Sequence, residues 1–285
     1  MKTGSLRSVW LHELRWPEIK AYLETSDVAL VPIGATEQHG FHLPLSVDTG
    51  WATAASVLAA TKANVLVAPP VPYGWSPHHM GYPGTVTLAA ETLRLVAIDI
   101  ATSLIHHGFK RIIFVNGNRI ANLPPLEIAA VQIKHLTGAY VGIADAGLIA
   151  KTEVAAMCSA SDGGLEHAGE AETAFALHWA GADVDMSAIP SVGAQHDAPQ
   201  HNEVRSSFDY TIELDPMKHG NSVSYAVSPL EHYQATAPTG SKADARPATP
   251  ELGRRMVEAI ATNLAAFIDE VRRQPLGPVK AGVPV

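Results

Sequence analysis

Cysteine is almost absent from this chain, and charged side chains are sparse. Cys158 is the single cysteine among 285 residues, so no disulfide can form within the chain, and the composition suits a reducing cytoplasm. Only 17% of the residues are charged, and the formal net charge at pH 7 is −8. Because a nucleic-acid-binding protein needs a clustered basic face, we expect no nucleic-acid partner.

The sequence also lacks a long hydrophobic run. The N-terminal stretch MKTGSLRSVWLHELRW contains no apolar core of the kind found in secretory signal peptides. No stretch reaches the roughly 18 apolar residues that a transmembrane helix needs. Hydrophobic residues still make up 47% of the chain, which is enough for a large buried core. We therefore expect a soluble cytoplasmic protein with no membrane partner.

Short apolar runs alternate with helical patterns along the chain. Buried strands are predicted at residues 27–35, 64–74, 111–117 and 139–145. Helices are predicted at residues 11–25, 48–63, 91–108, 123–136 and 249–273. Strands that alternate with helices form parallel βαβ units with helices on both faces of the sheet. The sequence therefore predicts a three-layer α/β/α fold with a mainly parallel central sheet. We expect residues 1–285 to form one domain with a loop-rich excursion over residues 186–247.

Polar clusters follow three of the predicted elements. They occupy residues 36–48, 76–85 and 116–122. Ligands of open parallel sheets bind at the carboxyl ends of the strands. We expect a functional site there, for a small-molecule substrate.

The first cluster, GATEQHGFHLPLSVDTG, spans residues 34–50. Glu37 and His39 are two residues apart, so in an extended segment both point to one side. Asp48 follows at the predicted start of a helix. Two carboxylates and an imidazole form a ligand set for an ion such as Zn²⁺ or Mn²⁺. The alternative is a polar loop with a surface histidine, in which Asp48 caps the helix.

The second cluster, SDGGLEHAGEAETAFALHW, spans residues 161–179. Glu166, Glu170 and Glu172 precede or begin a helical run. Acidic residues in a first helical turn have an ordinary structural role, because they complement the helix dipole. That role suits Glu166 and Glu170 best. A charged His167 would gain nothing from the dipole, which favours a chemical role for it.

The third cluster, SPHHMGYPGTVTL, spans residues 76–88. His78 and His79 lie on a loop beside a tight PGT turn. The alternative is a loop that Pro77 and Pro83 merely stiffen. Taken alone, this cluster does not predict a function.

Together these stretches resemble the creatininase (creatinine amidohydrolase) family. The matching pieces are VPIGATEQHGFHLPLSVD, HHMGYPGTVTL, RIIFVNGN, EHAGEAETA and TGSKADARPATPELGRRM, in order from about residue 28 to 256. The resemblance implies an α/β/α fold and a cyclic homo-oligomer, often a hexamer. It also implies a dinuclear zinc or manganese site that hydrolyses C–N bonds other than peptide bonds, especially in cyclic amides.

The resemblance also implies roles for individual residues. Glu37 would bind one of two metal ions, His39 the other, and Asp48 would bridge both. His167 would act as the acid–base residue beside the scissile bond. Glu172 would be a further metal ligand or an orienting carboxylate with a catalytic role.

Substrate contacts are assigned to the loops around the predicted site. His79 matches the histidine before PGT and would line the substrate pocket. Trp75 and Tyr82 flank it on the same loop, whereas core packing is favoured for Trp51. Arg119 would pair either with an anionic group of the substrate or with a neighbouring carboxylate.

The sequence departs from the family pattern at Asn118. The family usually has Asn-Gly-His at this strand end, with the histidine as a metal ligand, whereas this chain has Asn116-Gly117-Asn118. Ile120 stands where creatininase has a further metal-binding glutamate. An amide oxygen is a much poorer zinc ligand than an imidazole nitrogen. The site that holds His39 and Asp48 is therefore predicted to be one strong ligand short.

Three hypotheses about Asn118 are open. It is a laboratory substitution that impairs catalysis, a natural change toward a harder metal such as Mn²⁺ or Mg²⁺, or the mark of a relative that binds without turnover. The intact remainder of the site favours the first. The predicted activity is metal-dependent amide hydrolysis. Under the first hypothesis Asn118 impairs this activity. The alternatives are a catalytically weak small-molecule-binding relative and a metal-dependent isomerase or lyase on the same scaffold.

Overall fold

The computed structural model describes residues 6–160, 164–190 and 237–281. Its centre is a four-stranded sheet in the order β2-β1-β3-β4. The strands are Val28–Ile33 (β1), Leu66–Val67 (β2), Arg111–Asn116 (β3) and Tyr140–Asp145 (β4). Neighbouring strands pair in parallel throughout this sheet. The predicted α/β fold with a parallel sheet is confirmed.

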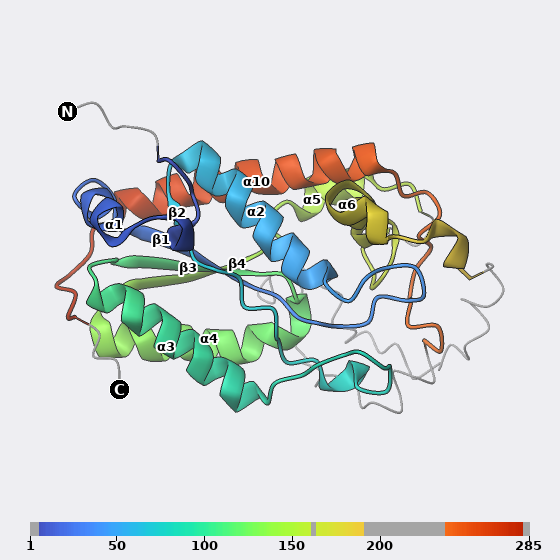
Figure 1. Ribbon diagram of the computed structural model, residues 1–285, viewed down its shortest axis with the longest axis horizontal. Helices are drawn as coiled ribbons and strands as arrows, with labels where there is room; N and C mark the ends of the chain where they lie inside the picture. The colour runs from blue at the N-terminus through green and yellow to red at the C-terminus, as the bar shows by residue number, and fades with distance from the viewer. Residues whose placement is uncertain (1–5, 161–163, 191–236, 282–285) are drawn as a thin grey trace, which may run out of the picture.

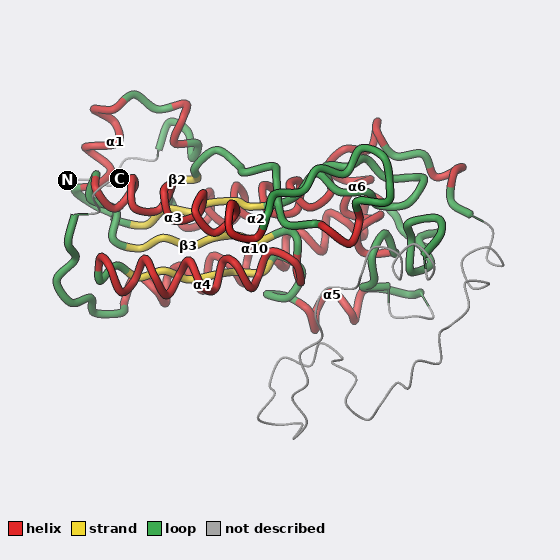
Figure 2. The backbone as a smooth tube through the Cα atoms, turned by 90° about the horizontal axis from the view of Figure 1, so that it is seen from below, coloured by secondary structure: helices red, strands yellow, loops and turns green. Residues whose placement is uncertain are grey.

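Helices cover both faces of the sheet, as Figure 1 shows. On one face lie Val47–Ala63 (α2), Glu170–Ala180 (α6) and Pro250–Arg273 (α10). On the other lie Ala90–His106 (α3) and Arg119–Thr137 (α4). Figure 2 looks onto the sheet and shows its strands running side by side. The remaining helices are Trp16–Leu23 (α1), Lys151–Met157 (α5) and the 3-10 turns Leu11–Glu13 (η1), Pro77–His79 (η2), Gly181–Asp183 (η3) and Met186–Ala188 (η4).

Burial on both faces explains why the strands are apolar without interruption. Successive side chains of a strand point to opposite faces of the sheet. Leu30 and Ile113 pack into the core with α2, α6 and α10. Val31 and Phe114 pack into the core with α3 and α4. Alternate residues of each strand therefore pack into the cores on opposite faces of the sheet. Polar residues occur where the strands end.

The predicted boundaries are wrong in two N-terminal segments. The helix expected at 11–25 is a 3-10 turn, Leu11–Glu13, followed by α1, which has Pro17 in its first turn. The strand expected at 64–74 is only the two residues of β2. Pro69, Pro70 and Pro72 lack the N–H that a continued strand needs.

Helix α4 begins at Arg119, four residues before the predicted start. Pro124 and Pro125 directly follow the predicted start, and prolines are typical of a first helical turn. In the structure both lie further inside the helix. Within the first turn of α4 the buried Asn122 donates its amide to Gly34 O at 3.0 Å, and its oxygen accepts from Trp75 N.

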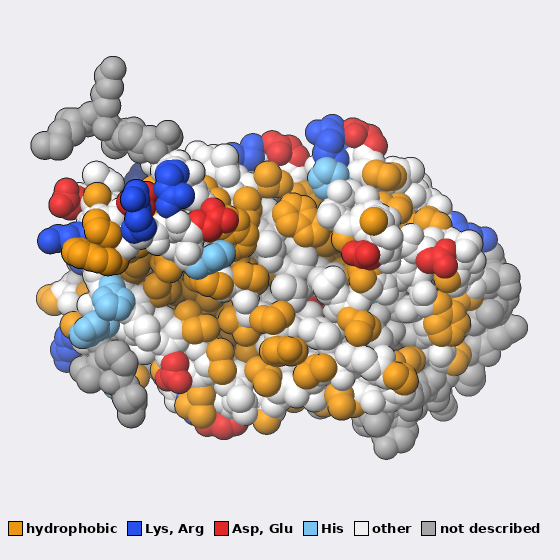
Figure 3. All heavy atoms as spheres, in the orientation of Figure 1, with side chains coloured by type: hydrophobic (Ala, Val, Ile, Leu, Met, Phe, Trp, Pro, Cys, Tyr) orange, Lys and Arg blue, Asp and Glu red, His pale blue; other side chains and the backbone are white. Residues whose placement is uncertain are grey.

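On the face shown in Figure 3, charged side chains lie at the end around α1 and along the upper edge, and much of the middle is apolar or uncharged. No helix in the described ranges is long and apolar enough to cross a membrane. Most of the expected excursion at 186–247 lies outside the described residues, and residues 237–247 form turns. Large apolar side chains are exposed at Trp16, Phe41, Tyr73, Met80, Val86, Leu95, Ile128, Val131, Leu136 and Trp179.

Candidate metal and active site

The carboxyl ends of three strands bring the polar loops together. Ile33 pairs with Asn116, and Asn116 pairs with Asp145, so β1, β3 and β4 end at the same level. The loop after β1 carries the EQH segment, and the turn after β3 carries Asn118. These loops meet at the right-hand end of the sheet in Figure 1.

Gly117 allows the turn after β3 to contact the first turn of α2. A Cβ at this position would lie 1.9 Å from the carbonyl oxygen of Asp48. Only glycine permits this approach of two backbones. The contact places Asn118 beside the start of α2, where Asp48 lies in the first turn and not at the N-cap. The capping alternative for Asp48 is therefore wrong.

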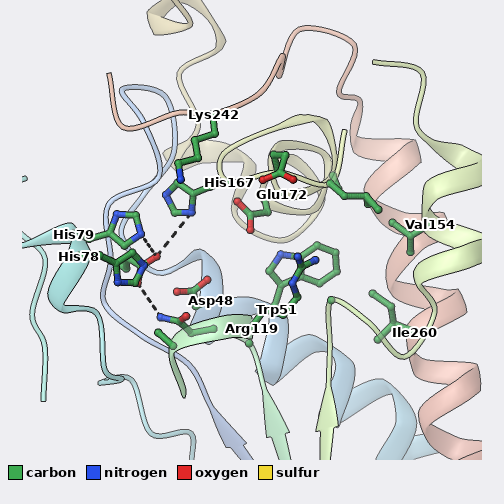
Figure 4. Close-up of a pocket in the computed structure, with 18 residues that line it drawn as sticks. Asp48, Trp51, His78, His79, Arg119, Val154, His167, Glu172, Lys242 and Ile260 are labelled. Atoms are coloured by element: carbon green, nitrogen blue, oxygen red, sulfur yellow. Dashed lines mark hydrogen bonds and ion pairs between the residues drawn. The ribbon is translucent and has the colours of Figure 1, made fainter. Parts of the chain in front are cut away.

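A cavity of about 170 Å³ opens at this end of the sheet. Figure 4 shows the side chains of Asp48, His167 and Glu172 pointing into it from different elements. His39 is fully buried and contacts the cavity wall through Asp48 and Glu172. The predicted site residues that line the cavity are Glu37, Asp48, His79, Asn118, Arg119, His167 and Glu172.

His39, Asp48 and Glu172 form one compact cluster. Nε2 of His39 lies 3.3 Å from Oδ1 of Asp48 and 3.6 Å from Oε2 of Glu172. Nδ1 of His39 lies 3.0 Å from the carbonyl oxygen of Glu37 and donates to it, so in the neutral ring Nε2 carries the lone pair. A lone pair that faces two carboxylates is repulsive unless a proton or a cation lies between them. Metal-ligating histidines are oriented in this way.

The ionisation of the cluster reflects this demand for positive charge. Burial lowers the pKa of His39, but Asp48 and Glu172 outweigh it and raise the pKa to about 10. Burial raises the pKa of Asp48 to about 7, against the opposing charge of His39. Burial also raises the pKa of Glu172, again opposed by His39. Without a cation, protonated His39 supplies the positive charge that the two carboxylates require.

The cluster fits a divalent cation. Among the described residues, Nε2 of His39 and Oδ2 of Asp48 are buried without a hydrogen-bond partner. One imidazole and two carboxylates suit Zn²⁺ or Mn²⁺, and three protein ligands leave positions open for water or substrate. Two other groups in the described chain also bring three ligand atoms within 4.8 Å, namely Glu37 with His39 and His167, and Glu37 with His78 and His79.

Glu37 accepts hydrogen bonds from two neighbours. Nε2 of His79 lies 3.0 Å from its Oε1, and Nδ2 of Asn118 lies 2.8 Å from its Oε2. The Asn118 amide also donates to Oγ of Ser76 at 3.0 Å. Burial would raise the pKa of Glu37, but the hydrogen bond from His79 and the nearby His167 lower it below its ordinary value. Glu37 is therefore ionised.

Asn118 lies on the Glu37 side of the site, where its amide contacts Glu37 and Ser76. The His39–Asp48 pair was expected to lack a ligand because Asn118 replaces histidine. Glu172 stands beside that pair, so its three-ligand set does not involve Asn118.

Gln38 determines which nitrogens of two histidines carry protons. Its amide nitrogen lies 2.8 Å from Nδ1 of His79 and 3.1 Å from the carbonyl oxygen of Gly240, which uses both of its hydrogens. His79 therefore accepts at Nδ1 and donates at Nε2 to Glu37. Nε2 of His167 lies 2.8 Å from the carbonyl oxygen of Gln38 and donates to it.

The other ring nitrogen of His167, Nδ1, therefore faces Glu37. Nδ1 of His167 lies 3.8 Å from Oε1 of Glu37. The ring also lies 4.3 Å from His39 and 4.6 Å from His79, measured between centroids. Burial, followed by the charges of His39 and His79, lowers the pKa of His167 well below its ordinary value. A neutral His167 with a lone pair at Nδ1 is able to accept a proton.

Two predicted substrate contacts lie outside the cavity wall. Trp75 packs against the core between the sheet and helices α3 and α4. Tyr82 donates its hydroxyl to the carbonyl oxygen of Ala237. Neither side chain is among those that line the cavity, so their contact with a substrate stays a prediction. Trp51 does line the cavity, although it also stacks on Phe175 with ring centroids 4.3 Å apart, as core packing requires.

In the second cluster, the structural role suggested for Glu166 and Glu170 applies to Glu170 only. Glu170 begins α6 and accepts from the backbone of Ser159 and Ala160, which is a structural role. Glu166 precedes the helix and lines the cavity, so the helix-dipole role does not apply to it. His167 also precedes α6 and does not lie within its first turn.

Sequence reasoning missed Gln38, Ser76 and Lys242. Lys242 lines the cavity beside His167 (Figure 4). Gln38 lies between two chemically informative residues, and Lys242 lies in the matched stretch TGSKADARPATPELGRRM. Their positions in the stretches that match the family were the signal that could have identified them as site residues. Side-chain type alone does not single out an amide, a hydroxyl or a surface-type lysine.

The fold and the buried imidazole–carboxylate cluster together are typical of metal-dependent enzymes with an α/β/α architecture. A family model described as creatininase, creatinine amidohydrolase, matches residues 12–268. The chain therefore belongs to the creatininase family.

Relatives of known function differ in their substrates. A mycofactocin precursor peptide peptidase of Mycolicibacterium smegmatis is 38% identical over 163 residues, which cover 55% of this chain and 60% of that protein. A creatinine amidohydrolase of Pseudomonas putida is 32% identical over 145 residues, 49% of this chain and 55% of that protein. The chain thus matches less than two thirds of the length of these relatives.

Solved structures agree in fold. A crystal structure of creatinine amidohydrolase has a TM-score of 0.72 and 24% identity, covering 95% of this chain and all of that one. A manganese form of creatininase has a TM-score of 0.73 and 24% identity over 94% of this chain and 100% of that one. A mutant creatininase described as Zn-Zn type has a TM-score of 0.72 and 23% identity, with the same coverage. These likenesses show the fold.

Proposed function

We propose that this protein is a metal-dependent amidohydrolase that cleaves a C–N bond of a small amide. The observation that carries the proposal is the His39–Asp48–Glu172 cluster beside a cavity, in which Nε2 of His39 and Oδ2 of Asp48 are buried without a hydrogen-bond partner among the described residues. Membership of the creatininase family supports the same reaction class. The names of the relatives, a peptidase and an amidohydrolase, both describe hydrolysis of amide bonds.

The chemistry needs a nucleophile, a polarised carbonyl and a proton carrier. His39, Asp48 and Glu172 would hold a divalent cation, which would supply Lewis acidity and make a water molecule at the site more acidic. Nδ1 of His167 accepts a proton from the attacking water, because Nε2 holds its own proton on Gln38. The same nitrogen then donates that proton to the departing amine. Glu37, at 3.8 Å, stabilises the imidazolium that forms in between.

The size and lining of the cavity restrict the reacting part of the substrate. A volume of about 170 Å³ accommodates an amide group with a few neighbouring atoms. A small cyclic amide or lactam satisfies this limit. The terminal amide of a peptide also satisfies it, and the peptidase relatives favour including peptides among the candidates. Arg119 and Lys242 on the wall favour a substrate that carries an anionic group near the scissile bond.

The test is turnover in water labelled with ¹⁸O. Chelator-treated protein is reloaded with Zn²⁺ or with Mn²⁺ and given creatinine, simple lactams and short peptides, and the products are identified by mass spectrometry. We expect one labelled oxygen in the carboxylate product and no turnover in the chelated control. Unlabelled products of equal mass would indicate an isomerase, and binding without turnover would indicate a non-catalytic relative. Either outcome contradicts the proposal.

We also propose that the chain assembles with copies of itself, with a hexamer as the expected size. Three apolar side chains near the site loops support this proposal, since Phe41, Met80 and Val86 are 64%, 47% and 45% exposed. Exposed apolar side chains mark protein interfaces where they form a contiguous patch. Light scattering on the full chain measures the mass, and a monomer at micromolar concentration would contradict assembly.

A further inference from the structure

The three candidate cation groups differ in where their lone pairs point. In the Glu37–His78–His79 group, His79 donates Nε2–H to Glu37 because Gln38 occupies its Nδ1. That nitrogen is a hydrogen-bond donor and does not offer a lone pair. In the Glu37–His39–His167 group, the Nδ1–H of His39 is directed to the carbonyl oxygen of Glu37, so His39 offers only Nε2, the nitrogen that faces Asp48 and Glu172.

The third group, His39–Asp48–Glu172, places the lone pair of His39 against two carboxylates. Nε2 of His39 faces Asp48 and Glu172, and this nitrogen and Oδ2 of Asp48 have no hydrogen-bond partner among the described residues. His39 is fully buried, and Asp48 is 4% exposed. Buried polar atoms without partners are rare in folded proteins, and a bound ion is one of the ways in which such atoms are satisfied.

Asn118 turns its nitrogen, not its oxygen, toward Glu37. Its Nδ2 donates to Glu37 at 2.8 Å and to Ser76 at 3.0 Å. The opposite orientation would place the amide oxygen against an ionised carboxylate, which is repulsive. Asn118 presents its hydrogens, not its oxygen, to Glu37, and Glu37 is a hydrogen-bond acceptor for both His79 and Asn118.

We infer that this chain binds one divalent cation, held by His39, Asp48 and Glu172, and that Asn118 retains Glu37 as a hydrogen-bonded carboxylate outside the coordination shell. The inference replaces the expectation of two ions per subunit. It also contradicts the hypothesis that Asn118 is an oxygen ligand for a harder metal. The inference rests on the same cluster as the proposed function, but the number of bound ions is measured without turnover. A count other than one would contradict the inference and leave hydrolysis possible. Absence of hydrolysis would contradict the proposed function and leave the ion count unaffected.

The experiment counts ions and compares two carboxylates. Chelator-treated full-length protein is titrated with Zn²⁺ alone and with Mn²⁺ alone by calorimetry, and metal content is measured after dialysis. We expect one ion per chain for the unaltered protein. Glu172→Gln is expected to weaken binding by at least about 10–100-fold, because it removes a ligand. Glu37→Gln, which keeps the size and an acceptor oxygen, is expected to weaken binding much less than Glu172→Gln does.

Asn118→His is the complementary variant. An imidazole at this position would face Glu37 with a lone pair, and we expect the count to rise to two. Thermal unfolding with and without Zn²⁺ reports on each variant independently of activity, and only Glu172→Gln is expected to lose the stabilisation by metal. Two ions of similar affinity in the unaltered protein, no ion at all, or loss of binding in Glu37→Gln would overturn the inference.

Discussion

The carbonyl oxygen of Gln38 accepts a hydrogen bond from Nε2 of His167 at 2.8 Å, while the side chain of the same glutamine donates to Nδ1 of His79. One residue thereby determines the tautomers of two imidazoles on either side of Glu37. Its backbone controls the proposed proton carrier, and its side chain controls the partner of Glu37. These two effects are separable, because a substitution changes only the second.

Substitution of Gln38 tests this control. In Gln38→Glu the carboxylate would accept from His79, so the proton of His79 moves to Nδ1 and Glu37 loses a donor. We expect kcat to fall about 10–100-fold, as for other residues that orient active groups, with a smaller change in KM. Histidine ¹⁵N NMR should show a changed state of His79 and an unchanged Nε2–H tautomer of His167. An unchanged His79 spectrum would contradict this role of Gln38.

Removal of the proposed proton carrier should separate catalysis from metal binding. His167→Gln removes Nδ1 as a base, and we expect kcat to fall by about 10²–10⁴. The metal content should remain that of the unaltered protein, because His39, Asp48 and Glu172 are intact. His106→Gln, at the end of α3 and outside the cavity wall, is the control for loss of an imidazole. A full rate in His167→Gln would assign proton transfer to another group.

Asp145 should make stability depend on pH. Burial, opposed by the charge of Arg119 and by a hydrogen bond from Asn116, raises its pKa to about 6, whereas an unfolded aspartate has a pKa of about 3.9. Its contribution to stability is therefore fully present below about pH 4 and is lost as the pH rises through 6. Two pKa units correspond to about 3 kcal/mol at most.

Asp145→Asn removes this titration. We expect the free energy of unfolding of the unaltered protein, relative to the variant, to fall by up to about 3 kcal/mol between pH 4 and pH 7. Urea denaturation at a series of pH values measures the difference, and effects of the other titrating groups cancel in it. Parallel pH profiles for the two proteins would show that Asp145 does not have the raised pKa.

The packing of α10 on α6 should not tolerate a methyl group at Gly253. A Cβ there would lie 1.9 Å from the carbonyl oxygen of Ala174. We expect Gly253→Ala to lower the free energy of unfolding by about 1–3 kcal/mol or more, because the two helices must separate. Metal affinity should fall as well, since α6 carries Glu172.

Gly181→Ala is the matched control for this substitution. A Cβ at Gly181 would meet no described atom within 4 Å, and the φ of −55° suits alanine. We expect no loss of stability and a gain of up to about 1 kcal/mol. Equal destabilisation by both substitutions would show that the α6–α10 contact is not as close as described.

Much of the fold follows from local patterns. The apolar runs at β1 and β3 predict buried strands, and the alternation with helices predicts a parallel sheet. Gly108, with φ of +110°, ends α3 where the sequence places the end. The failures lie at β2 and at the start of α4. There the outcome depends on how prolines and Asn122 meet other loops, and no local pattern contains that information.

The sequence by itself determined the layered fold, the residue types of the site and the replacement of a family histidine by Asn118. These features depend on side-chain periodicity and on residue identity. Only the tertiary structure decided that Glu172 stands beside His39 and Asp48, that Asn118 faces Glu37 with its nitrogen, and that Trp75 packs in the core. The direction of a lone pair or an amide hydrogen is set by neighbours that are distant in the chain. Electrostatic repulsion between these neighbours, not their order in the sequence, selects the arrangement.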